Sequence, residues 1–440
     1  MKRSAIESKR NLSKSGPKKK ELSGRESKGK AKKSPLDRTV QRTLLQYVLG
    51  AGMATLEECF ERDREQLCGG RYQHIEERVA YRAGYTMGQL ALGGRKVLVR
   101  RPRVRNLEDR EVELATWKQF AETDPLDART YEQMVLGVST RKYERSLEPM
   151  PEEVETSSTS KSAVSRRWVE ATEEKLRQME HRPLNALKLL GLMIDGIHLG
   201  GHVILVALGI DEQGKKHVLG LHEGATENAA SCTQLLTNLR DRGLPTDKAI
   251  LVVIDGAKAL HKAVKNVWGR LALIQRCQEH KKRNVLDHLP EGMKDPIRMR
   301  LQSIYNSTRV AWAESQLRSL AEELARSYPG AAASLLEGLE ETLTVMRLHV
   351  SEGIAKSLST TNLIENLMGA IRRTTRNVVR WQDGHMALRW AATALLEAEP
   401  RFLALKDARQ LGLLKLSLQA HHAAVLQLSQ NLDNPSKEAA

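Results

Sequence analysis

The stretch GLMIDGIHLGGHVILVALGID, residues 191–211, predicts two apolar strands joined at a glycine pair, and the first strand carries Asp195 followed by glycine. A second apolar run, AILVVIDGAKAL at residues 249–260, ends in the same way, with Asp255 before a glycine. An Asp-Gly pair at the end of one strand is usually a turn and nothing more. Two such pairs can instead bring two carboxylates together if the fold places the two strands side by side. The order of the surrounding elements therefore matters.

The segments around these runs predict a mixed α/β domain. Three short apolar segments with hairpin turns predict antiparallel strands, and a helix, a strand, a second helix and a further strand follow. In chain order these segments are residues 187–194, 202–210, 217–221, 229–242, 249–254, 257–267 and 271–276. This order is typical of an α/β ribonuclease-H-like fold with a mixed sheet, which we expect over residues 183–289 and 351–400. Residues 290–350 predict an α-helical insertion, and residues 401–440 predict a C-terminal helical tail.

In a fold of this order the first and fourth strands lie side by side, so we expect Asp195 and Asp255 to face one point. Two carboxylates held close together repel each other unless a cation lies between them. Mg²⁺ takes oxygen ligands of this kind, and two such ions can activate an attacking oxygen and stabilise a leaving one in phosphodiester chemistry. The pair therefore predicts a metal site for two Mg²⁺ ions, with Mn²⁺ as a substitute.

A third acid is expected from a helix that packs across the sheet. Glu365 lies early in the helix predicted from residue 359 onwards, and its apolar neighbours make an unpartnered acid costly there. Glu352 and Asp383 are the alternatives, and both lie in more polar, loop-like sequence. We therefore expect Asp195, Asp255 and Glu365 to be the catalytic residues and the metal ligands.

The chain of 440 residues is strongly basic, with a formal net charge of +16 and a pI near 9.7. This balance predicts a polyanionic partner, nucleic acid first and an anionic membrane surface second. Thirteen Lys and Arg against three Glu lie in residues 1–33, so residues 1–34 predict a basic disordered tail, either a solvated linker or a non-specific phosphate contact. The four cysteines show no paired framework and no apolar run is long enough for a membrane helix, so we expect a cytoplasmic, nucleoid-associated protein without a membrane partner.

Residues 35–182 predict a mainly helical DNA-binding region that precedes the α/β domain. Within it, Val97 and Val99 alternate with other residues and predict a short strand, which Pro102 ends or marks as an edge. The arginines of this segment form either a solvated hairpin face or a phosphate contact. Residues 127–181 predict two helices in a helix-turn-helix-like arrangement, and the second helix opens with small polar and basic groups suited to the major groove.

Four motifs taken together resemble the mutator-type transposases of bacterial insertion sequences. The motifs are MIDGIHLG, VIDGAKAL, IQRCQEHKKRNV and STTNLIENLMGAIRRTTRNVVRW, in this order, and the resemblance covers about residues 40–400. It implies a ribonuclease-H-like catalytic domain with an Asp-Asp-Glu triad, matched by Asp195, Asp255 and Glu365. It also implies a helical insertion between the second Asp and the Glu.

The resemblance further implies a Cys-x-x-His element, matched by Cys277 and His280, to which we assign no zinc because half of a tetrahedral site is missing. The implied activity is cleavage and strand transfer on double-stranded DNA, at terminal inverted repeats and in target DNA, by a homodimer or larger assembly. Two other functions keep some of these features. A ribonuclease-H-like nuclease without strand transfer has the same acids, and a catalytically silent DNA-binding regulator derived from a transposase binds the ends without cutting them.

The predicted DNA contacts are basic or small polar residues in four groups along the chain, since Lys and Arg neutralise phosphates. They are Arg100, Arg101, Arg103, Ser160, Lys161, Arg166, Arg167, His280, Lys281, Lys282, Arg283, Arg372, Arg373 and Arg376.

Overall fold

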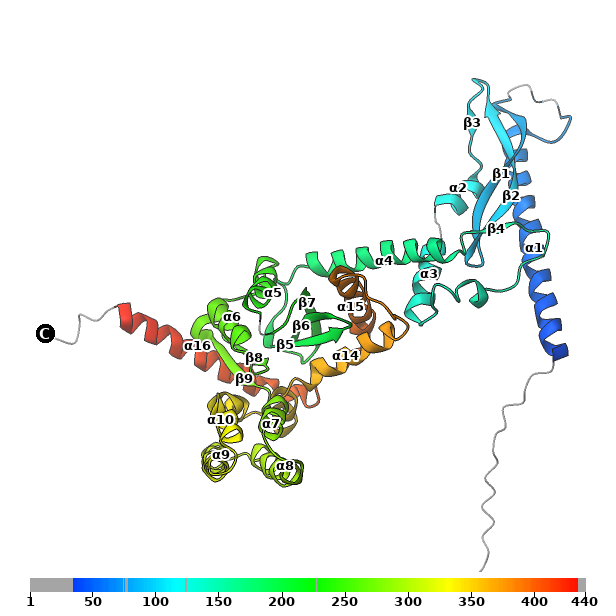
Figure 1. The fold of residues 1–440 in the computed structure, drawn as a ribbon. Coiled ribbons are helices and arrows are strands. Elements are labelled where there is room, and N and C mark those ends of the chain that lie inside the picture. The colour runs from blue at the N-terminus through cyan, green and yellow to red at the C-terminus, as the bar shows by residue number, and fades with distance from the viewer. Residues whose placement is uncertain (1–34, 74, 76–77, 123–124, 227, 434–440) are drawn as a thin grey trace, which may run out of the picture.

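The computed structural model describes residues 35–433 except 74, 76–77, 123–124 and 227 (Figure 1). The protein is mixed α/β, as the sequence predicted, with one antiparallel and one mixed sheet. The predicted basic tail, residues 1–34, lies outside the described residues. Within the described part of the chain, no helix combines the length and the apolar character that crossing a bilayer requires.

The first sheet lies against the long helix α1 (Pro35–Cys68) (Figure 1). Its strands are β1 (Ala80–Leu92), β2 (Arg95–Asn106), β3 (Glu111–Val112) and β4 (Thr156–Ser157), and all three pairings are made with β2. Val97 and Val99 are buried in one core with Phe60 of α1, because alternate side chains of a strand point to the same face. The region predicted as mainly helical therefore also contains a four-stranded sheet.

Strand β2 continues past Pro102, where the sequence predicted an end or an edge. Lys96 and Val97 pair with β4, whereas Val104 and Arg105 pair with β3. Pro102 thus lies between the parts of β2 that pair with β3 and β4. On this side of β2 no strand of the described residues pairs with Pro102, so its lack of an N–H costs no hydrogen bond.

The helices α3 (Pro125–Val135) and α4 (Lys161–His181) pack on each other without a short turn between them. Residues 136–160 separate them and include a 3-10 turn and β4. A helix-turn-helix joins its helices through only three or four residues, so the helix-turn-helix-like prediction for residues 127–181 is corrected. Instead, α4 runs from the first sheet to the second and packs on α15 and β7 (Figure 1).

Aromatic side chains form the joint between the two parts of the molecule. Trp168 of α4 stacks on Tyr131 of α3 at 5.7 Å between ring centroids, and it meets Trp390 of α15 at 4.5 Å. The Tyr131 hydroxyl donates to Glu397 Oε1 at 2.6 Å. Such aromatic pairs stabilise beyond the area they bury, so this joint is a packed contact.

The second sheet has the order β7-β6-β5-β8-β9. Its strands are β5 (Leu189–Leu199), β6 (His202–Asp211), β7 (Lys216–Glu223), β8 (Ile250–Ile254) and β9 (Ala272–Arg276). The pairs β5–β6 and β6–β7 are antiparallel, whereas β5–β8 and β8–β9 are parallel. The first and fourth strands of this sheet are therefore neighbours.

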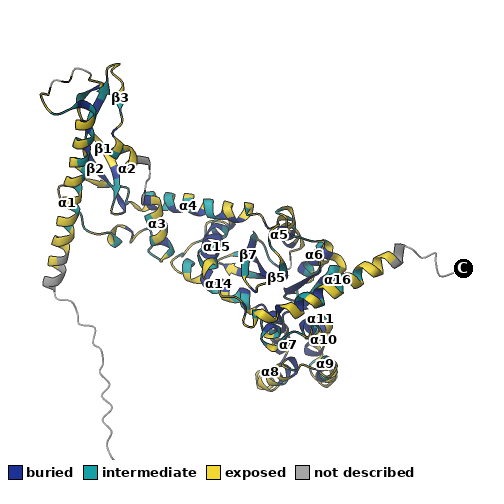
Figure 2. Cartoon of the chain, turned by 180° about the vertical axis from the view of Figure 1, so that it is seen from behind, coloured by how far each residue is buried: buried dark blue, intermediate teal, exposed yellow. Residues whose placement is uncertain are grey.

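Helices cover both faces of this sheet (Figure 1). One face carries α5 (Ala229–Asp241) and α6 (Lys258–Trp268). The other face carries the end of α4 together with α13 (Glu352–Leu358), α14 (Asn362–Thr375), α15 (Gly384–Ala398) and α16 (Leu411–Asp433). The strands between these two layers are buried, as the dark blue ribbon in Figure 2 shows.

Alternation along β5 decides which layer each side chain meets. Leu192 and Ile194 pack with α5 and α6, whereas Met193 and Ile197 pack with α14 and α15. Since side chains alternate between faces, Asp195 lies on the α14 side of the sheet.

A separate helical layer follows α7 (Gln278–Asp287), below the second sheet in Figure 1. Its helices are α8 (Glu291–Tyr305), α9 (Val310–Ala325), α10 (Pro329–Leu336), α11 (Leu339–Thr342) and α12 (Thr344–Arg347). They share a hydrophobic core with the apolar side of α7. Residues 290–350, expected to be an α-helical insertion, thus fold around an apolar cluster distinct from those of the second sheet.

Candidate active site

Asp195 lies on β5, and Asp255 directly follows the neighbouring parallel strand β8. The register of β5 and β8 pairs Met193 with Val253, so the two acids lie close together at this edge of the sheet, and the charge of Asp255 acts on Asp195. Neighbouring strands are about 4.8 Å apart. Asp195 is only 7% exposed, so its charge depends on the groups around it.

Glu365 and His280 form a cluster with Asp195. One ligand atom from each of the three side chains lies within 4.8 Å of the other two. Glu365 comes from the first turn of α14, and His280 comes from the start of α7, just after β9. Three segments far apart in the chain therefore converge on the α14 side of the sheet.

Asp255 lies next to this cluster, but its carboxylate is held by other partners. Its Oδ2 accepts a hydrogen bond from Thr226 Oγ1 at 2.9 Å, and its Oδ1 accepts one from the Ala257 N–H at 3.0 Å. The group that the structure brings together thus differs from the predicted trio, because His280 takes the third place beside Asp195 and Glu365.

Burial raises the pKa of Asp195 above its ordinary value. The positive charge of His280, the Gly196 N–H and the Thr361 hydroxyl act in the opposite direction, whereas the charge of Asp255 adds to the increase. The Gly196 N–H donates to Asp195 Oδ1 at 2.8 Å. A cation bound beside Asp195 would lower the pKa of its carboxyl group and keep it ionised. The surroundings of Asp195 are therefore suited to binding a cation.

Cys277 and His280 are coupled to each other and to Thr361. The Thr361 hydroxyl lies 3.4 Å from both Cys277 Sγ and His280 Nδ1, and the Thr361 N–H donates to the same sulfur at 3.3 Å. A hydrogen bond with Cys277 raises the pKa of His280 to about 9; burial opposes this, and the charges of Cys277 and Asp195 support it. Burial acts to raise the pKa of the Cys277 thiol, but the hydrogen bonds from His280 and Thr361 outweigh it and lower that pKa.

The donor set fits a hard divalent cation. The Asp195 and Glu365 carboxylates supply oxygens, the donors that Mg²⁺ and Mn²⁺ prefer. His280 lies beside the two acids, and the rise in its pKa favours the form that carries a positive charge. Cys277 is 1% exposed and is directed to Thr361, so no sulfur-rich zinc site forms among the described residues.

The alternative acids are placed elsewhere. Asp383 caps α15, where its Oδ1 accepts a hydrogen bond from the Met386 N–H at 2.7 Å. Glu352 is exposed in the first turn of α13. Neither belongs to the cluster around Asp195.

Arginines continue from Glu365 along α14. Arg372 and Arg376 follow Glu365 by two and three helical turns, so they share its face of the helix, and Arg373 lies beside them. All three are exposed. Arg376 also reaches the Leu136 carbonyl at 3.5 Å, at the end of α3. This basic strip leads away from the acid cluster and is available for phosphates.

The basic run after His280 is mostly buried. Lys281 is 4% exposed, and its Nζ donates to the carbonyls of Ser334 at 2.5 Å and Glu337 at 2.8 Å. Lys282 is 6% exposed and donates to Glu279 Oε1 at 2.7 Å. The prediction that these two lysines contact phosphates is therefore corrected, because their ammonium groups bind protein partners.

Among the other predicted contacts in this run, Arg283 is exposed on the outer side of α7. His280, also predicted to contact DNA, belongs to the acid cluster instead.

The arginines of β2 differ in their partners. Arg100 is exposed and lies over the Tyr85 ring at 3.9 Å. Arg101 and Arg103 form ion pairs with Glu111 at 3.5 and 2.9 Å. Of these three predicted contacts, Arg100 is thus the residue best placed to meet a phosphate, because the charges of the other two are already offset by a carboxylate.

The first turns of α4 keep part of the predicted basic surface. Ser160 caps the helix by accepting from the Ala163 N–H, and Lys161 and Arg166 are exposed. Arg167 instead pairs with Asp127 at 3.1 Å and donates to the Ser158 carbonyl. Arg167 therefore holds α3 and α4 together.

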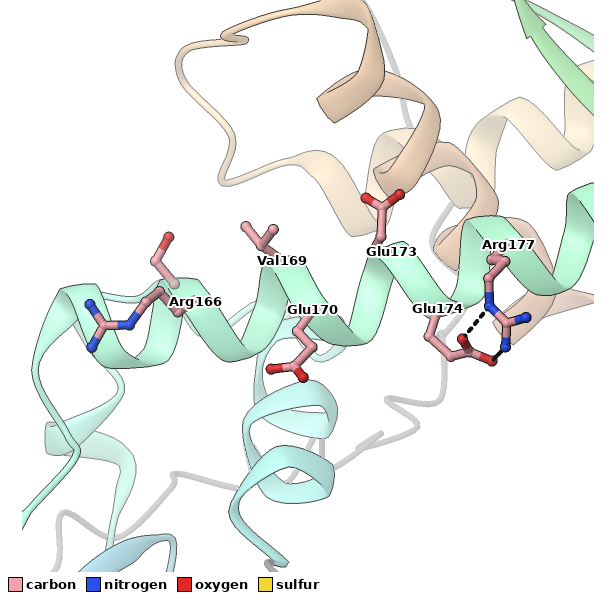
Figure 3. Close-up of a pocket in the computed structure, with 7 residues that line it drawn as sticks. Arg166, Val169, Glu170, Glu173, Glu174 and Arg177 are labelled. Atoms are coloured by element: carbon pink, nitrogen blue, oxygen red, sulfur yellow. Dashed lines mark hydrogen bonds and ion pairs between the residues drawn. The ribbon is translucent and has the colours of Figure 1, made fainter.

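Carboxylates replace the basic groups farther along α4. Figure 3 shows Glu170, Glu173 and Glu174 in a surface pocket between Arg166 and Arg177, with Glu174 in an ion pair with Arg177 at 2.7 Å. Acids at these positions disfavour phosphates, so the first turns of α4 are better suited to DNA than the rest of the helix.

The sequence patterns did not indicate that His280, Thr226 and Thr361 contact the acids. They predicted His280 as a DNA contact, and they gave no signal for Thr226 and Thr361. The Cys-x-x-His spacing was the only signal for His280. Hydrophobic periodicity cannot show that a single histidine after a strand lies beside acids that are remote in the sequence.

Comparisons with known proteins agree with one another. A family model described as "Transposase, Mutator family" matches residues 20–404. The chain is 28% identical over 376 residues to a transposase for insertion sequence element ISRM5 of Rhizobium meliloti, covering 83% of this chain and 88% of that protein. It is 26% identical over 387 residues to a transposase for insertion sequence element IS406 of Burkholderia multivorans, covering 84% of this chain and 96% of that protein.

Proposed function

This chain belongs to the Mutator family of transposases, and we propose that it binds the terminal inverted repeats of an insertion sequence and catalyses metal-dependent strand cleavage and strand transfer. The observation that carries the proposal is the convergence of Asp195, Glu365 and His280, with Asp255 on the adjacent strand. The strand order of the second sheet, three antiparallel strands followed by two parallel ones, is typical of a ribonuclease-H-like fold. It supports the assignment of Asp195, Asp255 and Glu365 as a catalytic acid trio.

Each side chain has a distinct task in this proposal. Bound Mg²⁺ or Mn²⁺ supplies Lewis acidity, which activates an attacking oxygen and stabilises a leaving one. Asp195 and Glu365 hold that charge, and Asp255 adds a carboxylate from the next strand while Thr226 fixes its orientation. His280 balances the negative charge of the cluster and positions Asp195.

The DNA path in this proposal follows exposed basic groups. Arg372, Arg373 and Arg376 contact phosphates next to the acids, because they continue the face of α14 that carries Glu365. Arg100 and the first turns of α4 contact phosphates farther away. Joining two ends of an element requires two copies of the site, so at least a dimer assembles on DNA.

The direct test is strand transfer with DNA that flanks the gene. Asp255→Asn removes one negative charge with little change in volume, and we expect strand transfer to fall by about a hundred- to a thousandfold. Asp241→Asn, an exposed acid at the end of α5, is the matched control and should leave the rate unchanged. Normal transfer by Asp255→Asn would refute the acid trio, and cleavage without joined products would favour a nuclease.

A further inference from the structure

A second pocket lies where the helical insertion meets the second sheet and its helices. It has a volume of about 440 Å³ and is lined by α7, the end of α8, the segment from α12 to α13 and the residues just before Glu365. Glu279 lines it and precedes His280 in the chain. Asn362 also lines it and lies one helical turn before Glu365, on the same face of α14. The pocket therefore adjoins the acid cluster.

The lining of this pocket is mainly uncharged and rich in hydrogen-bonding groups. Its amides and hydroxyls include Gln302, Asn306, Thr308, Thr360 and Asn362. Lys282 is neutralised by Glu279, and the further charges at the rim, Lys356 and Glu352, are of opposite sign. A multiply charged phosphate needs an excess of positive groups and a cation needs an excess of acids, so neither fits this lining.

Apolar side chains form the remaining wall. They are Val345, Met346, Val350 and Ala355. A ligand that matches this pocket has apolar faces and a polar edge with donors and acceptors. Nucleobases have this character, and single bases are bound in proteins by hydrogen bonds to the edge and apolar contact with the faces. A duplex is far too wide for a pocket of this volume.

One residue of the lining has an unusual backbone conformation. His349 lines the pocket with a φ of 49°, a left-handed conformation that non-glycine residues seldom adopt. Strained residues of this kind occur at ligand sites.

We propose that this pocket takes one unpaired nucleobase of the DNA substrate, adjacent to the phosphodiester held at the acid cluster. The proposal rests on the proposed function, since it requires DNA at the acids. Asn306 and Asn362 meet the polar edge of the base, and Met346 and Val350 contact its face. The insertion thereby senses that the DNA next to the reacting bond is unpaired.

The test compares DNA binding with and without that base. The full chain, with Ca²⁺ in place of Mg²⁺, is titrated with a duplex from the DNA flanking the gene that ends in a single-stranded 3′ overhang. A second duplex carries abasic sites throughout the overhang, and fluorescence anisotropy gives both Kd values. We expect the Kd of the base-bearing overhang to be at least about fivefold lower than that of the abasic one. This difference in binding free energy is smaller than that of a typical stacked base.

Two variants locate this preference. Asn306→Ala removes one amide of the lining at an exposed position, so it should reduce the preference about three- to fivefold without weakening the fold. Thr308→Trp fills the pocket from an exposed position at its mouth and should abolish the preference. Ser327→Trp, exposed in the insertion outside this pocket, is the control and should keep it.

The outcomes separate this inference from the proposed function. Equal Kd values for the two overhangs, or a preference that survives Thr308→Trp, would overturn the nucleobase pocket while strand transfer by the acids still stood. Failure to bind either duplex would overturn both. A preference abolished in Thr308→Trp and kept in Ser327→Trp supports the pocket, even if Asp255→Asn proved active.

Discussion

Single residues around Asp195 show how the fold keeps a buried acid usable. Its carboxylate is nearly enclosed, and burial alone favours the protonated form. The Gly196 N–H and the charge of His280 counter that tendency. Thr361, which is 0% exposed, lies at the start of α14 and links His280 to Cys277. Positioning residues of this kind set the orientation of the groups that hold a metal ion.

The variant Thr361→Val tests that role. It keeps the volume and removes the hydroxyl, so we expect the free energy of unfolding to fall by about 1–2 kcal/mol. We also expect Mn²⁺ affinity to fall about tenfold, because the partners of a metal site orient it. Urea denaturation and a Mn²⁺ titration followed by electron paramagnetic resonance measure the two effects.

Thr393→Val is the matched control for this variant. Thr393 is also 0% exposed, but its hydroxyl has no hydrogen-bond partner in the described structure. Its replacement should leave both quantities unchanged or raise the stability slightly. Unaltered Mn²⁺ binding in Thr361→Val would show that the threonine is merely part of the core.

Among the helices, α7 shows that a basic run can serve two purposes on opposite sides of one element. Lys281 and Lys282 face the insertion and bind its carbonyl and side-chain oxygens, whereas Arg283 faces solvent. Burial lowers the pKa of Lys281 to about 8, which is the expected direction for an ammonium removed from water. The helix therefore joins the insertion to the sheet with one face and offers a positive charge with the other.

Two substitutions on α7 separate these purposes. Lys281→Met leaves the Ser334 and Glu337 carbonyls without their donor, so the free energy of unfolding should fall by about 1–3 kcal/mol. The slope of log Kd for duplex DNA against log salt concentration should stay the same. Arg283→Gln should instead reduce that slope by about 0.9 with little change in stability. The reverse pattern would contradict the assignment of the two faces.

Across the molecule as a whole, the first and the second sheet lie toward opposite ends of α4 (Figure 1). Trp168, Tyr131 and Trp390 hold that helix against the second part of the protein, so the two regions proposed to face DNA keep a set spacing. Positive charge is spread along this length, from Arg100 to the exposed arginines of α14. A further cluster of Lys and Arg belongs to residues 1–33, which precede the described residues.

Deletion of residues 1–33 tests the contribution of that cluster. If these charges contact phosphates, non-specific duplex binding weakens, and its salt dependence becomes shallower by about 0.9 for each phosphate that is no longer neutralised. We expect this result, with no change in thermal unfolding of the remainder. Identical salt slopes for the full and the shortened chain would show that the segment is only a linker.

Local rules of sequence were sufficient for the mixed α/β architecture with its mixed sheet. These rules are the alternation of side chains along strands and the order of strands and helices. They also placed Glu365 on a helix with an apolar side, and that helix does cross the sheet beside Asp195. In residues 80–112 periodicity gave only the short strand around Val97 and Val99 and not the whole sheet, because its long hairpin is rich in arginine and glycine.

Long-range packing, in contrast, set which groups surround the acids and which lysines are buried. His280 joins Asp195 and Glu365 because β9 ends beside β8, a contact between residues remote in the chain. Lys281 and Lys282 are enclosed because α10 and α8 supply oxygens from the insertion. No local pattern records such contacts, since a charged residue has the same sequence signature whether it meets solvent or a carbonyl group.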